Sequence, residues 1–248
     1  MSFAFEGIKN LYGADGLDKI QKSHFLVIGI GGVGSWICEA LARSGATHLT
    51  IVDLDDICVS NINRQIHALA TNTGKQKIDE MKKRLLSINP NINVNCVHDF
   101  YSEESSDEIL SNNYTFIFDA IDSLKSKCIL IAKCKEQNIP LICIGGSGGK
   151  MDPTKIEIKD LNHTINDSLL FHVRKKLRKN FGFWRYYDRP FKIPTVFSTE
   201  LAKEASSDNC YNDKKINCQS GLGSASFVTA SFGFAAVSYV LSQVTMHD

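Results

Sequence analysis

A glycine-rich turn with a carboxylate downstream of it is the first group of residues that could do chemistry. The turn follows the apolar run 25–28 and holds four glycines, Gly29, Gly31, Gly32 and Gly34. Glycines allow a close approach of the backbone to a phosphate, and the helix start after them offers N–H groups to an anion. Asp53 lies about 20 residues further on, where a carboxylate accepts hydrogen bonds from ribose hydroxyls. These residues predict a nucleotide site, but they suit NAD or a flavin as well as ATP.

A second polar cluster adds positive charge to this site. Arg64 can bind a phosphate through two parallel hydrogen bonds, and Lys77 can supply a point charge. Asn61 and Gln65 can position phosphate oxygens or a ribose. Polyphosphate chemistry needs such neutralisation, usually with a metal ion, so the cluster favours ATP over a dinucleotide. The alternative is that Arg64 and Lys77 belong to the solvated surface near the helix expected at 75–88.

Short apolar runs alternate with segments of helical periodicity over residues 1–150, as in a parallel α/β sheet. Strands are expected at 25–30, 48–53, 93–98, 114–119 and 140–144. Helices are expected at 32–44, 75–88, 103–112 and 123–137. Asp122 is placed to cap the last of these helices, and Gly45 to end the first. Because open α/β sheets bind ligands at the carboxyl ends of their strands, Asp122 should lie at the site.

The region 151–248 should extend this nucleotide-binding core, 20–150, on the substrate side. Strands are expected at 155–159 and 195–199, with a helix at 166–181, an irregular loop at 181–194 and a long final helix. We therefore expect one domain over 1–248. Its fold class would be α/β, a Rossmann-like doubly wound mixed sheet in which additional C-terminal strands and a helix join a parallel core.

The stretch 219–247 contains no Lys, Arg, Asp or Glu. A membrane-spanning helix is one interpretation of its length and composition. However, serines dilute its apolar residues, and no lysines or arginines flank it. We favour a helix buried in the core or at a subunit interface and expect no membrane association.

The bulk composition narrows the class of protein. The formal net charge is +1, so no global field attracts nucleic acid, although a local patch still could. Eight cysteines are scattered without a CxxC pair, which argues against a zinc site of the usual spacing. We expect reduced thiols, no secretory signal and a cytoplasmic protein.

The segment 171–192 is both basic and aromatic, with eight Lys and Arg residues and a single acid, Asp188. Cations neutralise phosphates, and exposed aromatic rings can stack on unpaired bases. The pattern predicts an RNA-binding surface. Its candidate contacts are Arg174, Lys175, Arg178, Lys179 and Arg185. The alternative is a solvated helix face followed by a loop that folds on its own aromatic rings.

The motifs together resemble the ubiquitin-activating-enzyme superfamily, which includes the ThiF and MoeB adenylyltransferases. The residues that carry this resemblance are 29–34, Asp53, 61–65, Lys77 and 119–122. Within the superfamily, further motifs resemble the tRNA threonylcarbamoyladenosine dehydratases, namely 64–69, 145–154, 196–200 and 218–223. The resemblance covers roughly 5–170 and 194–245.

The superfamily resemblance implies ATP and Mg²⁺ binding, adenylation of a carboxylate and a homodimer, and the subfamily implies a tRNA substrate. By position, the nucleotide-binding residues would be the four glycines with Asp53, Asp55, Asn61, Arg64, Gln65 and Lys77. Asp53 would hold the ribose, and Arg64 and Lys77 would bind the β and γ phosphates. Asp122 would hold Mg²⁺, and it would form the catalytic set with Arg64 and Lys77.

The implied reaction is the ATP-dependent cyclisation of threonylcarbamoyladenosine in the anticodon loop, through an acyl-adenylate. One rival is an adenylyltransferase for the C-terminus of a ubiquitin-like sulfur carrier. Another is a non-catalytic nucleotide-binding partner in sulfur relay, in which a protein of the cysteine-desulfurase type would be the partner. A nicotinamide dehydrogenase is the least favoured.

Two positions leave the implied chemistry open. Cys218 is a candidate nucleophile, because relatives that transfer sulfur or ubiquitin-like proteins form covalent bonds through a cysteine, but no histidine lies near it in the sequence. Relatives also carry an N-terminal arginine that can reach the partner's ATP. Here no arginine precedes Arg43, and the two interpretations are that Lys9 replaces it or that this role is absent.

Overall fold

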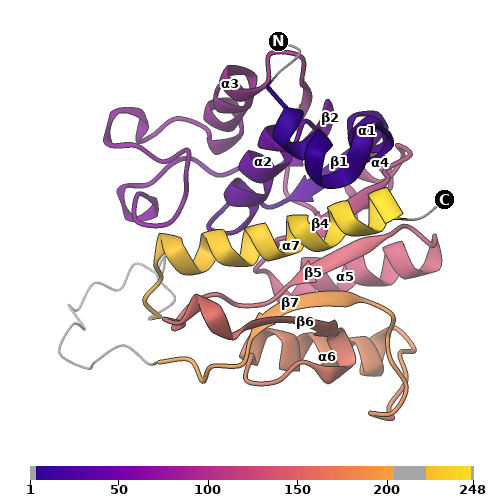
Figure 1. The fold of residues 1–248 in the computed structure, drawn as a ribbon. Helices are drawn as coiled ribbons and strands as arrows, with labels where there is room; N and C mark the ends of the chain where they lie inside the picture. The colour runs from indigo at the N-terminus through magenta and orange to yellow at the C-terminus, as the bar shows by residue number, and fades with distance from the viewer. Residues whose placement is uncertain (1–3, 204–221, 247–248) are drawn as a thin grey trace.

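The computed structural model describes residues 4–203 and 222–246. A seven-stranded sheet of order β3-β2-β1-β4-β5-β7-β6 forms its centre (Figure 1). Its strands are β1 (His24–Ile28), β2 (His48–Val52), β3 (Asn93–Val97), β4 (Phe116–Asp119), β5 (Leu141–Ile144), β6 (Ile156–Asp160) and β7 (Pro194–Ser198). Neighbouring strands are parallel except for the antiparallel pair β6 and β7. The expected Rossmann-like mixed sheet with a parallel core is confirmed.

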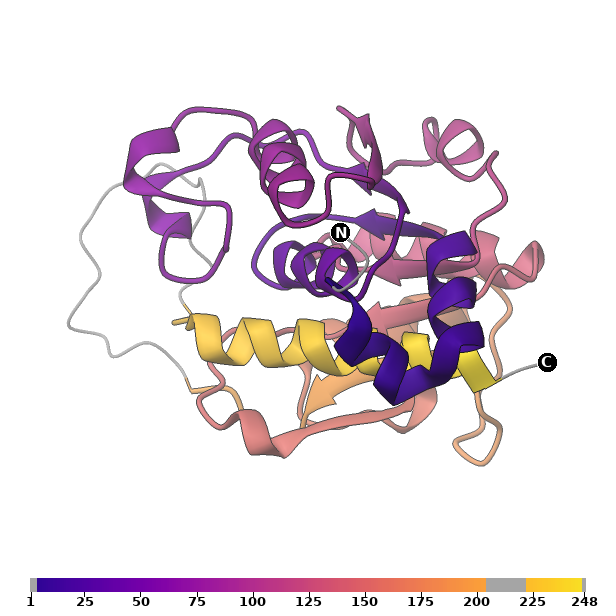
Figure 2. The ribbon, with the colours of Figure 1, turned by 45° about the horizontal axis from the view of Figure 1, so that its top comes forward.

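Helices cover both faces of the sheet (Figures 1 and 2). One face packs against α1 (Glu6–Lys22), α2 (Gly34–Arg43), α3 (Lys77–Ile88) and α7 (Ser226–Met246). The other packs against α4 (Ser106–Ile109), α5 (Leu124–Glu136) and α6 (Ser168–Asn180). In β1, Phe25 and Val27 join the first core, whereas Leu26 and Ile28 join the second. A strand buried on both faces needs an unbroken apolar run, which is what the sequence shows.

The direction of the strand order reverses between β1 and β4, which is the point where open α/β sheets generally bind ligands. The chain proceeds outward from β1 to β2 and β3, and it then returns to β4 on the other side of β1. The loops after β1 and β4 therefore diverge to opposite faces at their carboxyl ends. The loop after β1 is the glycine turn, and the loop after β4 carries Asp122.

Helix α7 lies across one face of the sheet, against α1 and α2 (Figure 1). Among the described residues it alone is long and apolar enough to cross a membrane by length and composition, a test that the core helix of a soluble protein also passes. Val228, Phe232 and Val240 are buried, while Phe227 and Phe234 are exposed. It packs as the core-helix interpretation requires and still presents apolar side chains outward.

One helix was missed and two local expectations were wrong. Helix α1 was not predicted, and its periodicity is interrupted by a kink at Gly13, where φ is +76°. The helix expected at 103–112 is a single turn, because Ser102 and Ser105 form a local side-chain hydrogen-bonded turn before it. Asp122 does not cap α5, which begins one residue later than expected, with Ser123 at its N-cap and no side-chain cap.

Short 3₁₀ segments complete the fold: η1 (Val59–Asn61), η2 (Ala70–Asn72), η3 (Pro153–Lys155) and η4 (Leu161–His163). The first two lie between β2 and α3, where the polar cluster of the sequence is found. The expectation for Gly45 is confirmed, because it follows α2 with a φ of +88°.

Candidate active site

The glycine turn packs between the end of β2 and the turn that follows β4. Gly29 has a φ of +82°, and its N–H donates to the Val52 carbonyl over 2.9 Å. A Cβ on Gly29 would lie 2.9 Å from the Ala120 carbonyl oxygen, and one on Gly34 only 1.8 Å from the Gly29 carbonyl oxygen. Side chains are therefore excluded at both ends of the turn, and α2 starts directly from it.

Asp53 is tied to this turn at the end of β2. Its carboxylate accepts hydrogen bonds from the Ile30 N–H over 2.8 Å and the Asp55 N–H over 2.9 Å. Burial raises the pKa of Asp53, whereas the charge of Lys77 and the two N–H donors favour its ionised form. A carboxylate with two oxygens can still accept from ribose hydroxyls at this place.

Lys77 opens α3 and is buried, with its side chain 7% exposed. Its ammonium contacts the Asp55 carboxylate over 2.6 Å, and its N–H donates to the Asp55 carbonyl over 3.0 Å. The Asp55 side chain is 53% exposed. A bound phosphate would therefore have to share or replace Asp55 as the partner of Lys77.

Asn61 organises the turn that carries Arg64 and Gln65. Its side-chain oxygen accepts from the Cys58 N–H over 3.0 Å, and its carbonyl accepts from the N–H groups of both Arg64 and Gln65. The position is buried. In this structure Asn61 thus shapes the site by hydrogen-bonding the backbone of the turn, and its side chain does not project into the solvent.

Arg64 and Gln65 lie over the middle of the glycine turn. The Arg64 Nη1 donates to the Ser60 carbonyl over 2.6 Å and to the Asn63 side-chain oxygen over 3.0 Å. A Cβ on Gly32 would lie 3.6 Å from the Arg64 Cδ, and Gln65 likewise neighbours the preceding glycine. The Gln65 Oε1 is buried without a hydrogen-bond partner among the described residues, so it has an acceptor to offer.

Asp122 is exposed in the turn between β4 and α5. No hydrogen bond or ion pair to the described residues uses its carboxylate, so both oxygens can coordinate. The described residues contain no cluster of three or more His, Cys, Asp or Glu side chains that could hold a metal alone. One free carboxylate beside a phosphate site suits Mg²⁺, which is usually bound by one or two carboxylates, phosphates and water.

The structure thus brings most predicted nucleotide residues to one edge of the sheet. The glycine turn, Asp53 and the Asp122 turn follow β1, β2 and β4 respectively. Arg64 and Gln65 contact the glycine turn, and Lys77 acts on Asp53 electrostatically. Cys218 lies outside the described residues. Lys9 forms an ion pair with Glu6 over 3.4 Å within α1.

The sequence interpretation missed several buried polar groups that lie among the loops and helices around the nucleotide site. Asp119 and Lys127 form an ion pair over 2.8 Å with both side chains fully buried. Asp167 accepts from the Gly146 N–H over 2.7 Å and caps α6. The Lys150 ammonium donates to the Asn166 and Glu200 carbonyls. Charged residues next to apolar runs were the only available signal, since the sequence does not show which charges pair.

His67 is a further missed group, although it lies in the same motif as Arg64. It is buried, and neither ring nitrogen has a hydrogen-bond partner among the described residues. Burial, followed by the charges of Lys77 and Arg84, lowers its pKa to about 4. The imidazole is therefore neutral at neutral pH.

The basic aromatic segment 171–192 splits into internal and exposed parts. Arg174 hydrogen-bonds Thr164, and Arg178 donates to the Trp184 carbonyl and to the side chain of Asn162. Asn162 in turn donates to the Tyr186, Tyr187 and Arg189 carbonyls. The loop is thus folded on itself, as the alternative interpretation stated. The candidate contacts that remain exposed are Lys175, Lys179 and Arg185.

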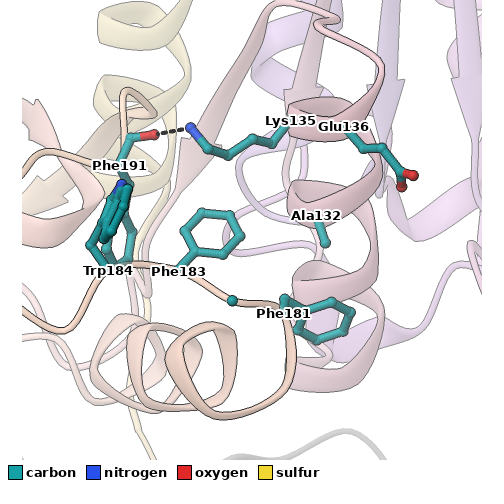
Figure 3. Close-up of a pocket in the computed structure, with 8 residues that line it drawn as sticks. Ala132, Lys135, Glu136, Phe181, Phe183, Trp184 and Phe191 are labelled. Carbon is teal, nitrogen blue, oxygen red and sulfur yellow. Dashed lines mark hydrogen bonds between the residues drawn. The ribbon is translucent and has the colours of Figure 1, made fainter.

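A cavity of about 350 Å³ lies between this loop and the end of α5. Figure 3 shows Phe181 and Phe183 of the loop on the side of Ala132 of α5, with Trp184 and Phe191 at the other side of the cavity. The Lys135 ammonium donates to the Phe191 carbonyl over 2.8 Å. Because α5 starts beside Asp122 and the cavity is lined by its residues Ala132 to Glu136, the cavity lies roughly 12–18 Å along the helix from the nucleotide edge. It is separate from the nucleotide site.

Comparisons with known proteins agree with this geometry. Residues 7–246 match the ThiF family. The chain is 47% identical over 241 residues to the tRNA threonylcarbamoyladenosine dehydratase of Haemophilus influenzae, covering 97% of this chain and 92% of that protein. It is 42% identical over 248 residues to the Escherichia coli K12 enzyme of the same name, again covering 97% and 92%.

The structural comparison gives the same result. The crystal structure of the Escherichia coli dehydratase, TcdA, in complex with AMP has a TM-score of 0.91, with 42% identity over 98% of this chain and 94% of that one. The same protein in complex with ATP has a TM-score of 0.89, with 41% identity and the same coverage. The chain belongs to the ThiF family, and within it to the tRNA threonylcarbamoyladenosine dehydratases.

Proposed function

We propose that this protein catalyses the ATP-dependent dehydration of threonylcarbamoyladenosine in the anticodon loop of tRNA, closing it to a ring. One observation carries the proposal. The glycine turn, Asp53, Arg64 and Lys77 meet at one edge of the sheet, in a chain that is similar over nearly its whole length to a dehydratase solved with ATP and with AMP.

In the first step, the threonyl carboxylate attacks the α-phosphorus of ATP and pyrophosphate leaves. Asp53 accepts hydrogen bonds from the ribose, and the N–H groups of the glycine turn receive the phosphates. Lys77 and Arg64 stabilise the negative charge that develops on the leaving pyrophosphate. Since Lys77 is paired with Asp55 over 2.6 Å, a phosphate of ATP would share or replace that carboxylate as the partner of Lys77.

In the second step, a carbamoyl nitrogen or the neighbouring base edge attacks the acyl carbon of the acyl-adenylate. The carboxyl oxygen leaves with AMP, and the attacking nitrogen loses its proton. The elements of one water are therefore lost from the nucleoside, while ATP becomes AMP and pyrophosphate. No covalent enzyme intermediate is needed, because acyl group and nucleophile belong to the same nucleoside.

Asp122 would hold Mg²⁺ when the metal is bound with ATP. Its carboxylate is exposed and unpaired within the described part of the chain, which fits an ion shared with phosphates. The metal would supply charge stabilisation on the phosphates during their transfer. Arg64, Lys77 and Asp122 would thus be the catalytic residues.

The tRNA would contact the exposed cations of α6 and the following loop, Lys175, Lys179 and Arg185. Lys175 and Lys179 are four residues apart, so they lie on one face of α6. Phe171 precedes Lys175 by the same interval and is 55% exposed. Arg174 and Arg178, in contrast, support this surface through their internal hydrogen bonds.

A homodimer would cover the exposed apolar side of α7. Phe227 and Phe234 are 57% and 47% exposed, and Trp36 of α2 stacks edge-on against Phe234 with ring centroids 5.9 Å apart. Val59 of η1 and Ile62, which follows η1, add exposed apolar surface. Light scattering of the purified protein would test this directly.

The remaining parts of the proposal concern organisation. The chain would act as one domain over 1–248, because β6 and β7 of the substrate-side region extend the same sheet as the core at 20–150. It would work in the cytoplasm, where tRNA is modified. None of the six cysteines among the described residues forms a disulfide, which suits a reducing compartment. A sulfur-transfer protein of the cysteine-desulfurase type would be an optional partner.

The experiment that tests the function is exchange of radiolabelled pyrophosphate into ATP. Purified protein is assayed with tRNA that carries threonylcarbamoyladenosine, with the same tRNA lacking the modification, and with a ubiquitin-like sulfur carrier. Exchange that requires the modified tRNA is expected. Exchange with the carrier alone would favour the adenylyltransferase alternative, and no exchange at all would favour a non-catalytic nucleotide-binding partner.

A further inference from the structure

The buried ion pair of Asp119 and Lys127 lies directly behind the turn that carries Asp122. Both side chains are 0% exposed, and the Lys127 Nζ lies 2.8 Å from the Asp119 Oδ1. Burial alone would lower the pKa of Lys127, but the Asp119 carboxylate, together with Cys143 and with Asp167 at the start of α6, raises that pKa overall, so the ammonium stays charged.

The pair fixes the backbone between β4 and α5 at several points. The Lys127 Nζ also donates to the Asp119 carbonyl over 3.1 Å, and the Asp119 Oδ1 accepts from the Ile121 N–H over 3.2 Å. The Ala120 N–H donates to the Ile28 carbonyl over 3.0 Å. Residues 119–121 are therefore held from both sides, and the next residue is Asp122.

This turn has little room to move against the glycine turn. The Ala120 carbonyl lies 2.9 Å from the place of a Cβ on Gly29, and the Ala120 side chain lies 3.3 Å from that of a Cβ on Gly34. The glycine turn has independent supports, namely the Val52 carbonyl and the Asp53 carboxylate. If the Ala120 turn lost its support from Lys127 and shifted, Asp122 would move with it. Asp53 would keep its place, because the glycine turn to which it bonds is supported separately.

Stability alone does not account for such a pair. Removing two charges from water costs about as much as their attraction returns, and well-packed apolar replacements of similar volume are often neutral or stabilising. The hydrogen bonds to the Asp119 carbonyl and the Ile121 N–H are what an apolar pair would not reproduce. What Lys127 and Asp119 specifically contribute is to fix the position of the turn at residues 119–121.

We propose that Lys127 is a positioning residue that, through Asp119, fixes the turn bearing Asp122 and thereby sets the affinity of the site for Mg²⁺. This inference rests on the proposed metal role of Asp122. Partners that orient a metal ligand from behind typically change metal affinity or activity by about 10- to 100-fold when they are replaced.

The test measures binding rather than turnover. Calorimetry records the Mg²⁺ concentration that gives half-maximal binding of a non-hydrolysable ATP analogue, and the affinity for AMP without metal. For Lys127→Met we expect at least a tenfold rise in the Mg²⁺ requirement, with AMP affinity within about threefold of the wild type because Asp53 is undisturbed. The matched control is Lys133→Met on the same helix, whose ammonium pairs with Asp107 near the surface and which should match the wild type.

The double variant Asp119→Leu with Lys127→Met keeps the inference testable if the single variant does not fold, because it leaves no unpaired buried charge. We expect it to fold and to retain the raised Mg²⁺ requirement. A wild-type Mg²⁺ requirement in the double variant would overturn the inference. If the wild type itself bound the analogue equally well without Mg²⁺, the proposed metal role would fall, and this inference with it.

Discussion

The buried imidazole of His67 should make the folded protein sensitive to acid. Its pKa is about 4 in the folded chain, against 6.5 for an unperturbed histidine, because of burial and then the charges of Lys77 and Arg84. The unfolded chain therefore binds a proton below pH 6.5 that the folded chain does not bind. The stability from a neutral His67 is fully present above about pH 6.5 and is lost as the pH falls toward 4.

The size of the effect follows from the difference between the two pKa values. At about 1.4 kcal/mol per pH unit, that difference is worth on the order of 3 kcal/mol, and most of it should be lost by about pH 4.5. This is a large fraction of the about 5–15 kcal/mol that stabilises a typical domain. This loss of unfolding free energy at acid pH should be measurable in an ordinary urea titration.

The perturbation is His67→Gln, which cannot titrate, and the assay is urea unfolding at pH 7 and about pH 4.5. The wild type should lose roughly 2–3 kcal/mol more than the variant between these conditions. The matched control is His98→Gln, since His98 is 40% exposed and pairs with Asp79 at the surface. The control should lose as much as the wild type. Equal losses for the wild type and His67→Gln would refute the reasoning.

Three further predictions concern the nucleotide and RNA surfaces. Gly34→Ala should abolish AMP binding, because its Cβ would lie 1.8 Å from the Gly29 carbonyl oxygen. Calorimetry measures AMP binding and circular dichroism checks the fold, and AMP binding as tight as that of the wild type would contradict the prediction. Lys77→Met should weaken ATP binding by about 10- to 100-fold, the range for hydrogen bonds to charged groups, but leave AMP affinity nearly unchanged; equal losses for both nucleotides would speak against a β- or γ-phosphate partner. Lys175→Glu combined with Lys179→Glu should lower tRNA affinity and reduce its salt slope by about 2, with Lys22→Glu in α1 as control, and an unchanged slope would place the RNA elsewhere.

The parallel core could be predicted because its signals are local. Strands buried on both faces give apolar runs such as 25–28, and the glycine turn is specified by backbone geometry at Gly29 and Gly34. Helix α1 could not be predicted in the same way. Its kink at Gly13 breaks the periodicity, and its packing against α7 depends on residues more than 200 positions away.

The residues of the candidate site likewise fall into those with a local sequence signal and those that only the three-dimensional packing identifies. Asp53 and Lys77 follow from their positions after a strand and at a helix start, which the sequence contains. The partners of a charge do not: Lys127 pairs with Asp119, and Arg178 bonds the loop that follows it rather than facing solvent. Both lie in segments whose composition is equally typical of a surface helix. Only the three-dimensional packing distinguishes a supporting cation from an exposed one.

The most direct test of the central claim is analysis of the nucleosides of a treated tRNA. The tRNA carrying threonylcarbamoyladenosine is incubated with protein, ATP and Mg²⁺, digested and examined by mass spectrometry, while AMP and pyrophosphate are quantified. We predict that the modified nucleoside loses one water in step with one AMP and one pyrophosphate, and that Asp53→Ala abolishes the change. A nucleoside of unchanged mass, in a reaction where ATP is nonetheless consumed, would contradict the account.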